Sequence, residues 1–178
     1  MSASYSAVIS AIGRGFDGLD VPALAKDLGA ELIRLEDFDA TVAAVLAEAP
    51  AAENIVAQGT GDIAFDAEVA AALGLPLAII SGAPQRTGEL AQHNAESLGA
   101  TVAGIFTDLE AVPGALAALG DVSPVMSADL FQKQLIDQAR AAGSHIVLPE
   151  GDDDRILEAA HVVLRDKVAK LTILGNEA

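Results

Sequence analysis

Residues 54–81 read NIVAQGTGDIAFDAEVAAALGLPLAIIS and hold one complete repeat of the pattern that decides the fold. A short β-branched run, Asn54–Ala57, is followed by an alanine-rich amphipathic segment, Asp66–Leu73, and then by a second apolar run, Leu77–Ser81. Gly74 comes directly after the helical segment, at the position where glycine most often ends a helix. This stretch therefore predicts a strand, a helix and a second strand.

The same rhythm extends in both directions from this repeat. Further strands are predicted at Tyr5–Ile12, Glu31–Leu35 and Thr101–Thr107, and further helices at Val21–Leu28, Asp39–Ala49 and Gly88–Leu98. Gly29 and Gly99 end two of these helices, as Gly74 ends the third. Parallel strands joined by helices must be covered on both faces, so we expect an α/β fold, a doubly wound parallel sheet with right-handed crossovers, over residues 1–121.

A second piece follows the first. Residues 109–124 interrupt the rhythm with prolines and glycines, which predict a short helix and then a linker at 122–126. Beyond it the sequence predicts a helix from Ser127 to about Ala142, a strand at His145–Leu148, a loop at Pro149–Asp154, a helix at Arg155–Arg165 and a strand at Lys170–Leu174. Such a small βαβ unit has an apolar face that only further strands could cover. We therefore expect residues 127–178 to be an incomplete second α/β unit.

Composition limits the class of protein. A hydrophobic content of 52% and a mean hydropathy of +0.40 exclude a disordered chain. The formal net charge of −16 repels nucleic acid and anionic membrane, and aromatic residues make up only 3%, too few for base stacking. Acids outnumber bases 17 to four in residues 1–125 but only nine to six in residues 126–178, which supports two different pieces. Without cysteine or a basic leader, a cytoplasmic protein that binds neither nucleic acid nor membrane is expected.

The turn after the first strand has the glycine spacing of a phosphate-binding loop. Gly13 and Gly18 match that spacing, but Leu19 and Asp20 stand where a working loop has its lysine and its serine or threonine. Gln58 ends the third strand, where an acid would complete a magnesium site. Two losses in one site favour a degenerate P-loop NTPase-like scaffold that binds no nucleotide cofactor.

No metal site is expected either. His93, His145 and His161 are far apart in the sequence, and none is followed by a metal-ligating residue four positions later. The acidic run at 150–154 lacks the ligand spacing of a calcium loop and is better explained as an acidic start to the next helix. Composition and spacing alone thus predict an α/β protein without a visible active site.

One segment is more specific than the rest. Residues 144–160 read SHIVLPEGDDDRILEAA, and a strand ending in Leu174, Gly175 and Asn176 follows. Together with the preceding helix, these parts resemble, in order, the opening of the catalytic domain of phosphate acetyltransferases. Residues 1–121 are more weakly similar to the N-terminal domain of the long forms of that family, which has a dethiobiotin-synthetase-like fold, with the best agreement between Asn54 and Asp108.

The resemblance implies reversible transfer of an acetyl group from acetyl-CoA to phosphate, with coenzyme A as a substrate and with no metal or prosthetic group. In this family most of the cationic and basic groups that the reaction needs lie beyond the point where this chain ends. Arg155 matches the arginine that lines the family's cleft and is the one substrate-binding candidate; the alternative is a structural ion pair with Glu150 or Asp152. No catalytic residue is assigned within the chain.

We therefore predict an N-terminal fragment of a long-form phosphate acetyltransferase, inactive by itself, whose first domain serves regulation or assembly. We also expect a homo-oligomer, because an unfinished sheet edge favours pairing between chains. Two alternatives stay open: a non-enzymatic module that senses a metabolite or holds subunits together, and a nucleotide-dependent ligase or synthetase.

Overall fold

The chain folds as two units, Met1–Asp129 and Leu130–Ala178, in a computed structural model that describes residues 5–175. Asn176, the last residue of the strand-ending motif noted above, lies outside the described residues. Within residues 5–175, no helix combines the length and the apolar character needed to cross a bilayer.

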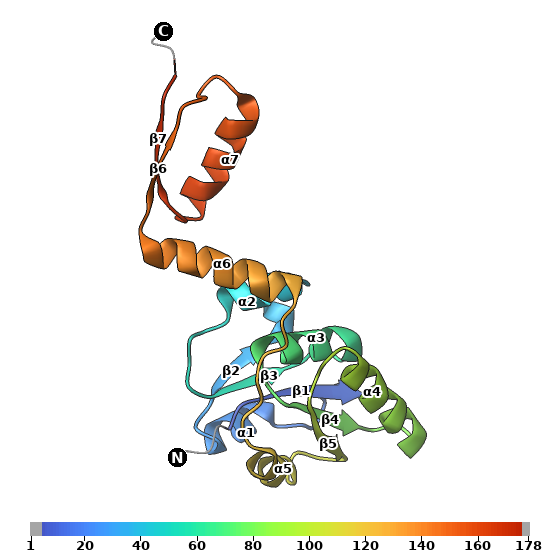
Figure 1. Ribbon diagram of the computed structural model, residues 1–178. Coiled ribbons are helices and arrows are strands. Elements are labelled where there is room, and N and C mark those ends of the chain that lie inside the picture. The colour runs from blue at the N-terminus through green and yellow to red at the C-terminus, as the bar shows by residue number, and fades with distance from the viewer. Residues whose placement is uncertain (1–4, 176–178) are drawn as a thin grey trace. The chain divides into compact units, whose positions relative to one another are not determined.

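A five-stranded sheet forms the middle layer of the first unit (Figure 1). Its strands are β1 (Ala7–Ile12), β2 (Glu31–Arg34), β3 (Ile55–Gln58), β4 (Leu77–Ser81) and β5 (Val102–Phe106). They lie in the order β2-β3-β1-β4-β5, and every neighbouring pair is parallel. The predicted α/β fold with a parallel central sheet is confirmed.

Helices cover both faces of this sheet. One face carries α2 (Val42–Glu48), α3 (Ile63–Leu73) and α4 (Gln85–Ser97), and the other carries α1 (Val21–Asp27) and α5 (Val112–Leu119). Successive residues of β1 point to opposite layers, so that Val8 packs with the first group of helices and Ile9 with the second. Both side chains are fully buried. The central strands are therefore sealed from water on both faces.

Two helices begin earlier than their sequences predict. α3 begins at Ile63 because the carboxylate of Asp62 caps it, accepting hydrogen bonds from the N–H groups of Ala64 and Phe65. α4 begins at Gln85, directly after Pro84, and has no side-chain cap. β2 ends at Arg34 and runs into a 3₁₀ turn, η1 (Leu35–Asp37), before Thr41 caps α2. Side-chain caps therefore set the starts of α3 and α2, and a 3₁₀ turn follows the end of β2.

The second unit is a βαβ element with a preceding helix. It contains α6 (Ala128–Ala142), whose first two residues lie in the first unit, then β6 (His145–Leu148), α7 (Asp154–Arg165) and β7 (Lys170–Ile173). β6 and β7 are parallel and in direct register from His145 with Lys170 to Leu148 with Ile173. Large apolar side chains stay open to water on every element of this unit: Phe131, Leu135, Ile146, Val147, Leu157, Val162, Leu164 and Ile173.

The predicted linker, 122–126, follows the surface of the first unit. Its Val125 N–H donates a 2.8 Å hydrogen bond to the carbonyl of Ala71 near the end of α3. Pro124 packs on Gly74, where an added Cβ would lie 2.6 Å from the proline ring nitrogen. Gly74 also has φ +68°, which favours glycine. The assignment of residues 1–121, 122–126 and 127–178 to separate regions stays a prediction.

Candidate functional site

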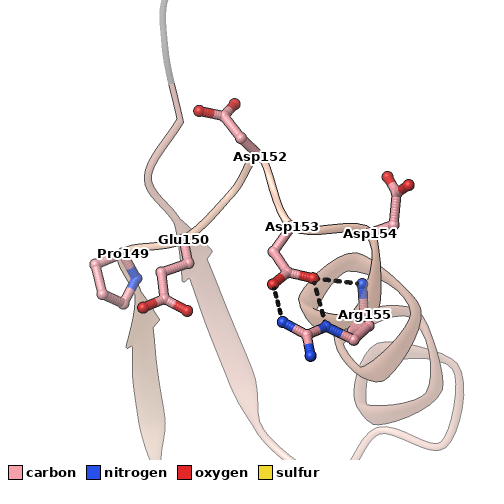
Figure 2. Close-up of a pocket in the computed structure, with 6 residues that line it drawn as sticks. All are labelled: Pro149, Glu150, Asp152, Asp153, Asp154 and Arg155. Atoms are coloured by element: carbon pink, nitrogen blue, oxygen red, sulfur yellow. Dashed lines mark hydrogen bonds and ion pairs between the residues drawn. The ribbon is translucent and has the colours of Figure 1, made fainter.

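The loop between β6 and α7 forms an open hollow of about 750 Å³ (Figure 2). Six residues line it: Pro149, Glu150, Asp152, Asp153, Asp154 and Arg155. They follow the carboxyl end of a parallel strand and lead into a helix, which is where ligands of open α/β sheets usually bind. All six belong to the segment that carries the family resemblance.

A glycine holds this loop against the end of the neighbouring strand. The Gly151 N–H donates a 2.8 Å hydrogen bond to the carbonyl of Leu174, directly after β7. An added Cβ at Gly151 would lie 2.6 Å from that carbonyl oxygen, so any side chain would displace the loop. The structure thus brings the two ends of the sequence motif, residues 149–151 and Leu174, to one edge of the β6–β7 pair.

Arg155 folds back onto the residue that caps its own helix, as Figure 2 shows. Its Nε and Nη2 donate to the two carboxylate oxygens of Asp153 at 3.1 and 2.6 Å, and its backbone N–H donates to the same carboxylate. This pairing lowers the pKa of Asp153 and raises that of Arg155, chiefly through the side-chain hydrogen bonds. The ion pair that the sequence assigned to Glu150 or Asp152 is therefore made by Asp153.

The arginine is still accessible to a ligand. Its side chain is 88% exposed, and the pair with Asp153 uses two of its five N–H donors. The electrostatics of the hollow are nonetheless unfavourable for anions, because its lining has four carboxylates and a single cation. The residues that line the hollow could orient one anionic oxygen through Arg155 but would repel a polyphosphate.

The phosphate-loop-like turn of the first unit is filled by its own side chains. The Asp20 carboxylate accepts a 2.9 Å hydrogen bond from the Ala23 N–H and caps α1, where a phosphate would otherwise meet the helix. Leu19 packs into the core layer beneath α1. Gly13 has φ +73°, and a Cβ there would lie 2.9 Å from that of Ala83, so this glycine serves a tight turn.

Sequence reasoning missed the buried acid of the first unit. Asp66, on α3, is completely buried and accepts hydrogen bonds from Ser10 Oγ at 2.6 Å, Thr60 N and Oγ1 at 2.8 and 2.9 Å, and Gly61 N at 3.2 Å. Burial raises the pKa of Asp66, and these hydrogen bonds oppose that rise. A Cβ on Gly59 would strike the carboxylate. The glycine-rich loop 59–61 was the available signal.

The histidines do not converge. His145 Nε2 lies 2.8 Å from the hydroxyl of Thr172 on the neighbouring strand, His93 lies on α4, and His161 lies on α7. In the part of the chain that the structure describes, no three His, Asp or Glu side chains gather into a possible metal site. The first-unit residue Gln58 ends β3 as predicted.

Comparison with known proteins finds a match for the segment that contains the hollow. Residues 130–178 match the family of phosphate acetyl/butaryl transferases. These residues are the whole of the second unit. The family that matches these residues is the one that the sequence motif indicated.

Several curated relatives carry the name phosphate acetyltransferase. The chain is 61% identical to that of Corynebacterium glutamicum over 51 residues, which are 29% of this chain and 16% of the relative. It is 49% identical to that of Synechocystis over 47 residues, 26% and 7% of the two chains. For Escherichia coli the identity is 41% over 63 residues, 35% and 9%. The matched parts thus cover less than a fifth of each phosphate acetyltransferase. No solved structure matches the chain.

Proposed function

We propose that this chain is the N-terminal portion of a phosphate acetyltransferase, in which residues 127–178 open the domain that carries out acyl transfer. The main support for this proposal is the 61% identity over 51 residues to a phosphate acetyltransferase. It is supported by the geometry of the motif, since Gly151 binds the end of β7 and Asp153 fixes Arg155 at one edge of the β6–β7 pair.

The reaction transfers the acetyl group of acetyl-CoA to phosphate. A phosphate oxygen attacks the thioester carbonyl carbon, the C–S bond breaks, and the thiolate of coenzyme A leaves and takes up a proton. The products are acetyl phosphate and coenzyme A. Catalysis requires cationic donors around the phosphate and around the developing oxyanion, together with a group that handles the thiol proton.

Arg155 is the one described residue that we assign to this chemistry. Its guanidinium is oriented by Asp153 and keeps three N–H donors for an anionic oxygen of the substrate. Asp153 acts as a positioning residue, because it holds the arginine fork while its own carboxylate is neutralised. The remaining cations must come from other parts of the protein, since four carboxylates line the hollow.

The 178-residue chain should therefore be inactive by itself. The test is a chimera in which residues 130–178 replace the residues of the Corynebacterium glutamicum relative that align with them. We expect acetyl phosphate formation within about tenfold of that relative, because an equivalent segment preserves the fold of the site. A folded but inactive chimera, shown by circular dichroism, would contradict the proposal. So would turnover at ordinary enzyme rates by the 178-residue chain alone.

A matched pair of arginines tests the substrate role within this chimera. Arg155 and Arg165 both lie on α7 and both pair with a neighbouring aspartate, Asp153 and Asp166 respectively. Arg155→Ala should raise the KM for phosphate or lower kcat/KM by about a hundredfold, whereas Arg165→Ala should leave both unchanged. Equal effects of the two substitutions would contradict a specific role for Arg155.

For the first unit we propose a regulatory or assembly role on a degenerate P-loop NTPase-like scaffold. The carboxylate of Asp20 at the start of α1 and the neutral Gln58 at the end of β3 support the loss of nucleotide binding. Titration calorimetry with Mg-ATP should detect no binding below about millimolar concentration. Micromolar binding would instead favour the nucleotide-dependent ligase or synthetase.

A non-enzymatic module is the second candidate function. It is favoured by the apolar side chains that the second unit leaves exposed, such as Phe131 at 60%. The molar masses of the 178-residue chain and of residues 1–126, measured by light scattering, separate a role in holding subunits together from a role in sensing a metabolite. A homo-oligomer formed by both chains places assembly in the first unit. A homo-oligomer formed only by the longer chain places it after residue 126.

A further inference from the structure

A separate cavity of about 320 Å³ lies in the first unit, away from both glycine-rich turns. Its walls come from the start of α2, the second half of α3, the end of α4, the segment before α6 and the first turn of α6. Its lining includes Val42, Glu68, Ala71, Ala72, Leu98, Val125 and Asp129. This volume is at the lower end of the range of small-molecule sites.

The charged side chains that line this cavity are of one sign. Glu68 and Asp129 contribute carboxylates, and among the residues that the structure describes no lysine or arginine lines it. α3 and α4 both end at the cavity, and neither has a basic residue in its last turn. Helix C-termini carry a partial negative charge that such residues normally offset. The starts of α2 and α6 each bring a partial positive charge to the cavity. Asp129 in the first turn of α6 compensates for that of α6, whereas α2 has no acidic residue in its first turn.

The lining between these charges is apolar. Ala71 and Ala72 are buried, Leu98 is half-buried, and Val125 is 45% exposed at the rim. Burial of a short hydrocarbon chain against these side chains would remove apolar surface from water. A cation with an aliphatic part therefore fits both the charge and the lining, whereas phosphate, acetyl phosphate and coenzyme A are excluded by charge.

From this combination we propose that the cavity is a binding site for a small primary amine. Its ammonium group lies between the helix C-termini and Glu68, and its hydrocarbon part lies on Ala71, Leu98 and Val125. Val125 is held to the unit by its hydrogen bond to Ala71. An occupied cavity therefore stabilises the docked position of residues 124–126. This inference is independent of the acyl-transfer assignment, which concerns the other unit.

The test uses the complete 178-residue chain, labelled with ¹⁵N, and n-pentylammonium as the probe. Amide resonances of Ala71, Ala72, Leu98 and Val125 should shift in a saturable way, and exchange of the Val125 N–H with solvent should slow. 1-Pentanol, which has the same chain length without the charge, should bind about fivefold more weakly. Pentanoate should cause no shift. Equal affinities for the three compounds would overturn the proposal.

Two variants locate the charge recognition. Glu68→Gln keeps the size of the side chain and should weaken pentylammonium binding about fivefold without changing that of pentanol. Glu36→Gln, an exposed acid on η1 that does not line the cavity, is the matched control and should change neither. The proposal fails if Glu68→Gln leaves the affinity unchanged, or if both variants weaken it equally, because the attraction would then be that of the net charge.

Discussion

The two units of this chain contain the same parallel βαβ element but differ in what covers it. In the first unit, Ile79 of β4 lies between two helical layers and is fully buried. In the second, Ile146 of β6 is 44% exposed, and Val147 beside it is 54% exposed. Both strands have the apolar, β-branched sequence of a buried strand. A parallel strand therefore becomes part of a core only where layers on both of its faces seal it from water.

The units also differ in how they hold their acids. Asp66 of the first unit is buried with all its partners provided by the surrounding backbone and hydroxyl groups. Asp137, Asp153 and Asp166 of the second unit pair with Lys or Arg at the surface, and these pairs lower their pKa values. A layered unit can replace the water around a buried carboxylate with its own hydrogen-bond donors. In the open unit, lysine and arginine side chains and water stabilise the carboxylates instead.

Amide hydrogen exchange should show the largest contrast. β4 (Leu77–Ser81) pairs with a strand on each side, so its N–H groups should open only with the first unit as a whole, whereas β6 has a single neighbouring strand among the described residues. We expect exchange in β4 to be at least about a thousandfold slower than in β6. Equal protection of the two strands would break the comparison, because it would mean that the second unit is equally well covered in solution.

Matched truncations in the two strands should differ next most strongly. Ile79→Ala removes a fully buried side chain and should lower the free energy of unfolding of the first unit by about 3 kcal/mol. Ile146→Ala removes a half-exposed one and should cost less than about 0.5 kcal/mol. Urea unfolding followed by circular dichroism measures both. A cost of Ile146→Ala close to that of Ile79→Ala would be the contradictory result.

The buried acid gives a prediction of intermediate size. Asp66→Ala leaves the hydroxyl of Ser10 and the N–H groups of Thr60 and Gly61 without their acceptor and should cost about 2 kcal/mol. Arg155→Ala breaks an ion pair in the second unit whose arginine is exposed and whose aspartate is half-buried, and it should leave the unfolding transition of the first unit unchanged. Urea unfolding of both variants at pH 6 is the measurement.

The same residue predicts a pH dependence. Because the pKa of Asp66 is raised in the folded state, the native protein binds more protons than the unfolded one between the ordinary value of 3.8 and the folded pKa. The stability advantage of the wild type over Asp66→Ala should therefore be greatest below pH 3.8 and should decrease as the pH rises through the folded pKa. An advantage that grows with pH would show that the hydrogen bonds outweigh the desolvation.

Alanine substitutions at two glycines of the first unit separate the effect of backbone conformation from that of packing. They should cause the smallest changes in the free energy of unfolding. Neither Gly29 nor Gly114 has an atom near its missing Cβ, but Gly29 has φ +63° and Gly114 lies in the first turn of α5. Gly29→Ala should destabilise the first unit by about 1 kcal/mol, and Gly114→Ala should stabilise it by about 0.5 kcal/mol. Thermal unfolding of both variants checks the signs. A shift of the same sign in both would contradict the backbone argument.

Much of the first unit could be predicted because its signals are local. The periodicity of residues 54–81 and the glycines that follow the helices specify a strand or a helix from neighbouring residues alone. α3 nevertheless begins at Ile63 rather than Asp66, because the cap at Asp62 competes with the acid that also resembles a helix start. The carboxylate of Asp66 instead accepts a hydrogen bond from Ser10, which lies 56 residues earlier in the chain.

The candidate site was predicted in part for the same reason. The motif at 144–160 located Arg155, but sequence spacing favoured Glu150 or Asp152 as its partner. The helix cap turns Asp153 toward the guanidinium instead. The cavity beside α3 had no sequence signal, because Glu68 and Asp129 are 61 positions apart and converge only when residues 124–126 dock.

The sequence by itself determined the alternation of strands and helices, the glycine turn after β1 and the similarity of residues 130–178 to phosphate acetyl/butaryl transferases, because each depends on residues close together in the chain. Only the tertiary structure decided the strand order, which helices cover which face, the burial of Asp66 and the formation of the cavity lined by Glu68 and Asp129. These features depend on contacts between distant residues, whose free energy becomes favourable only after the sheet has formed and excluded water.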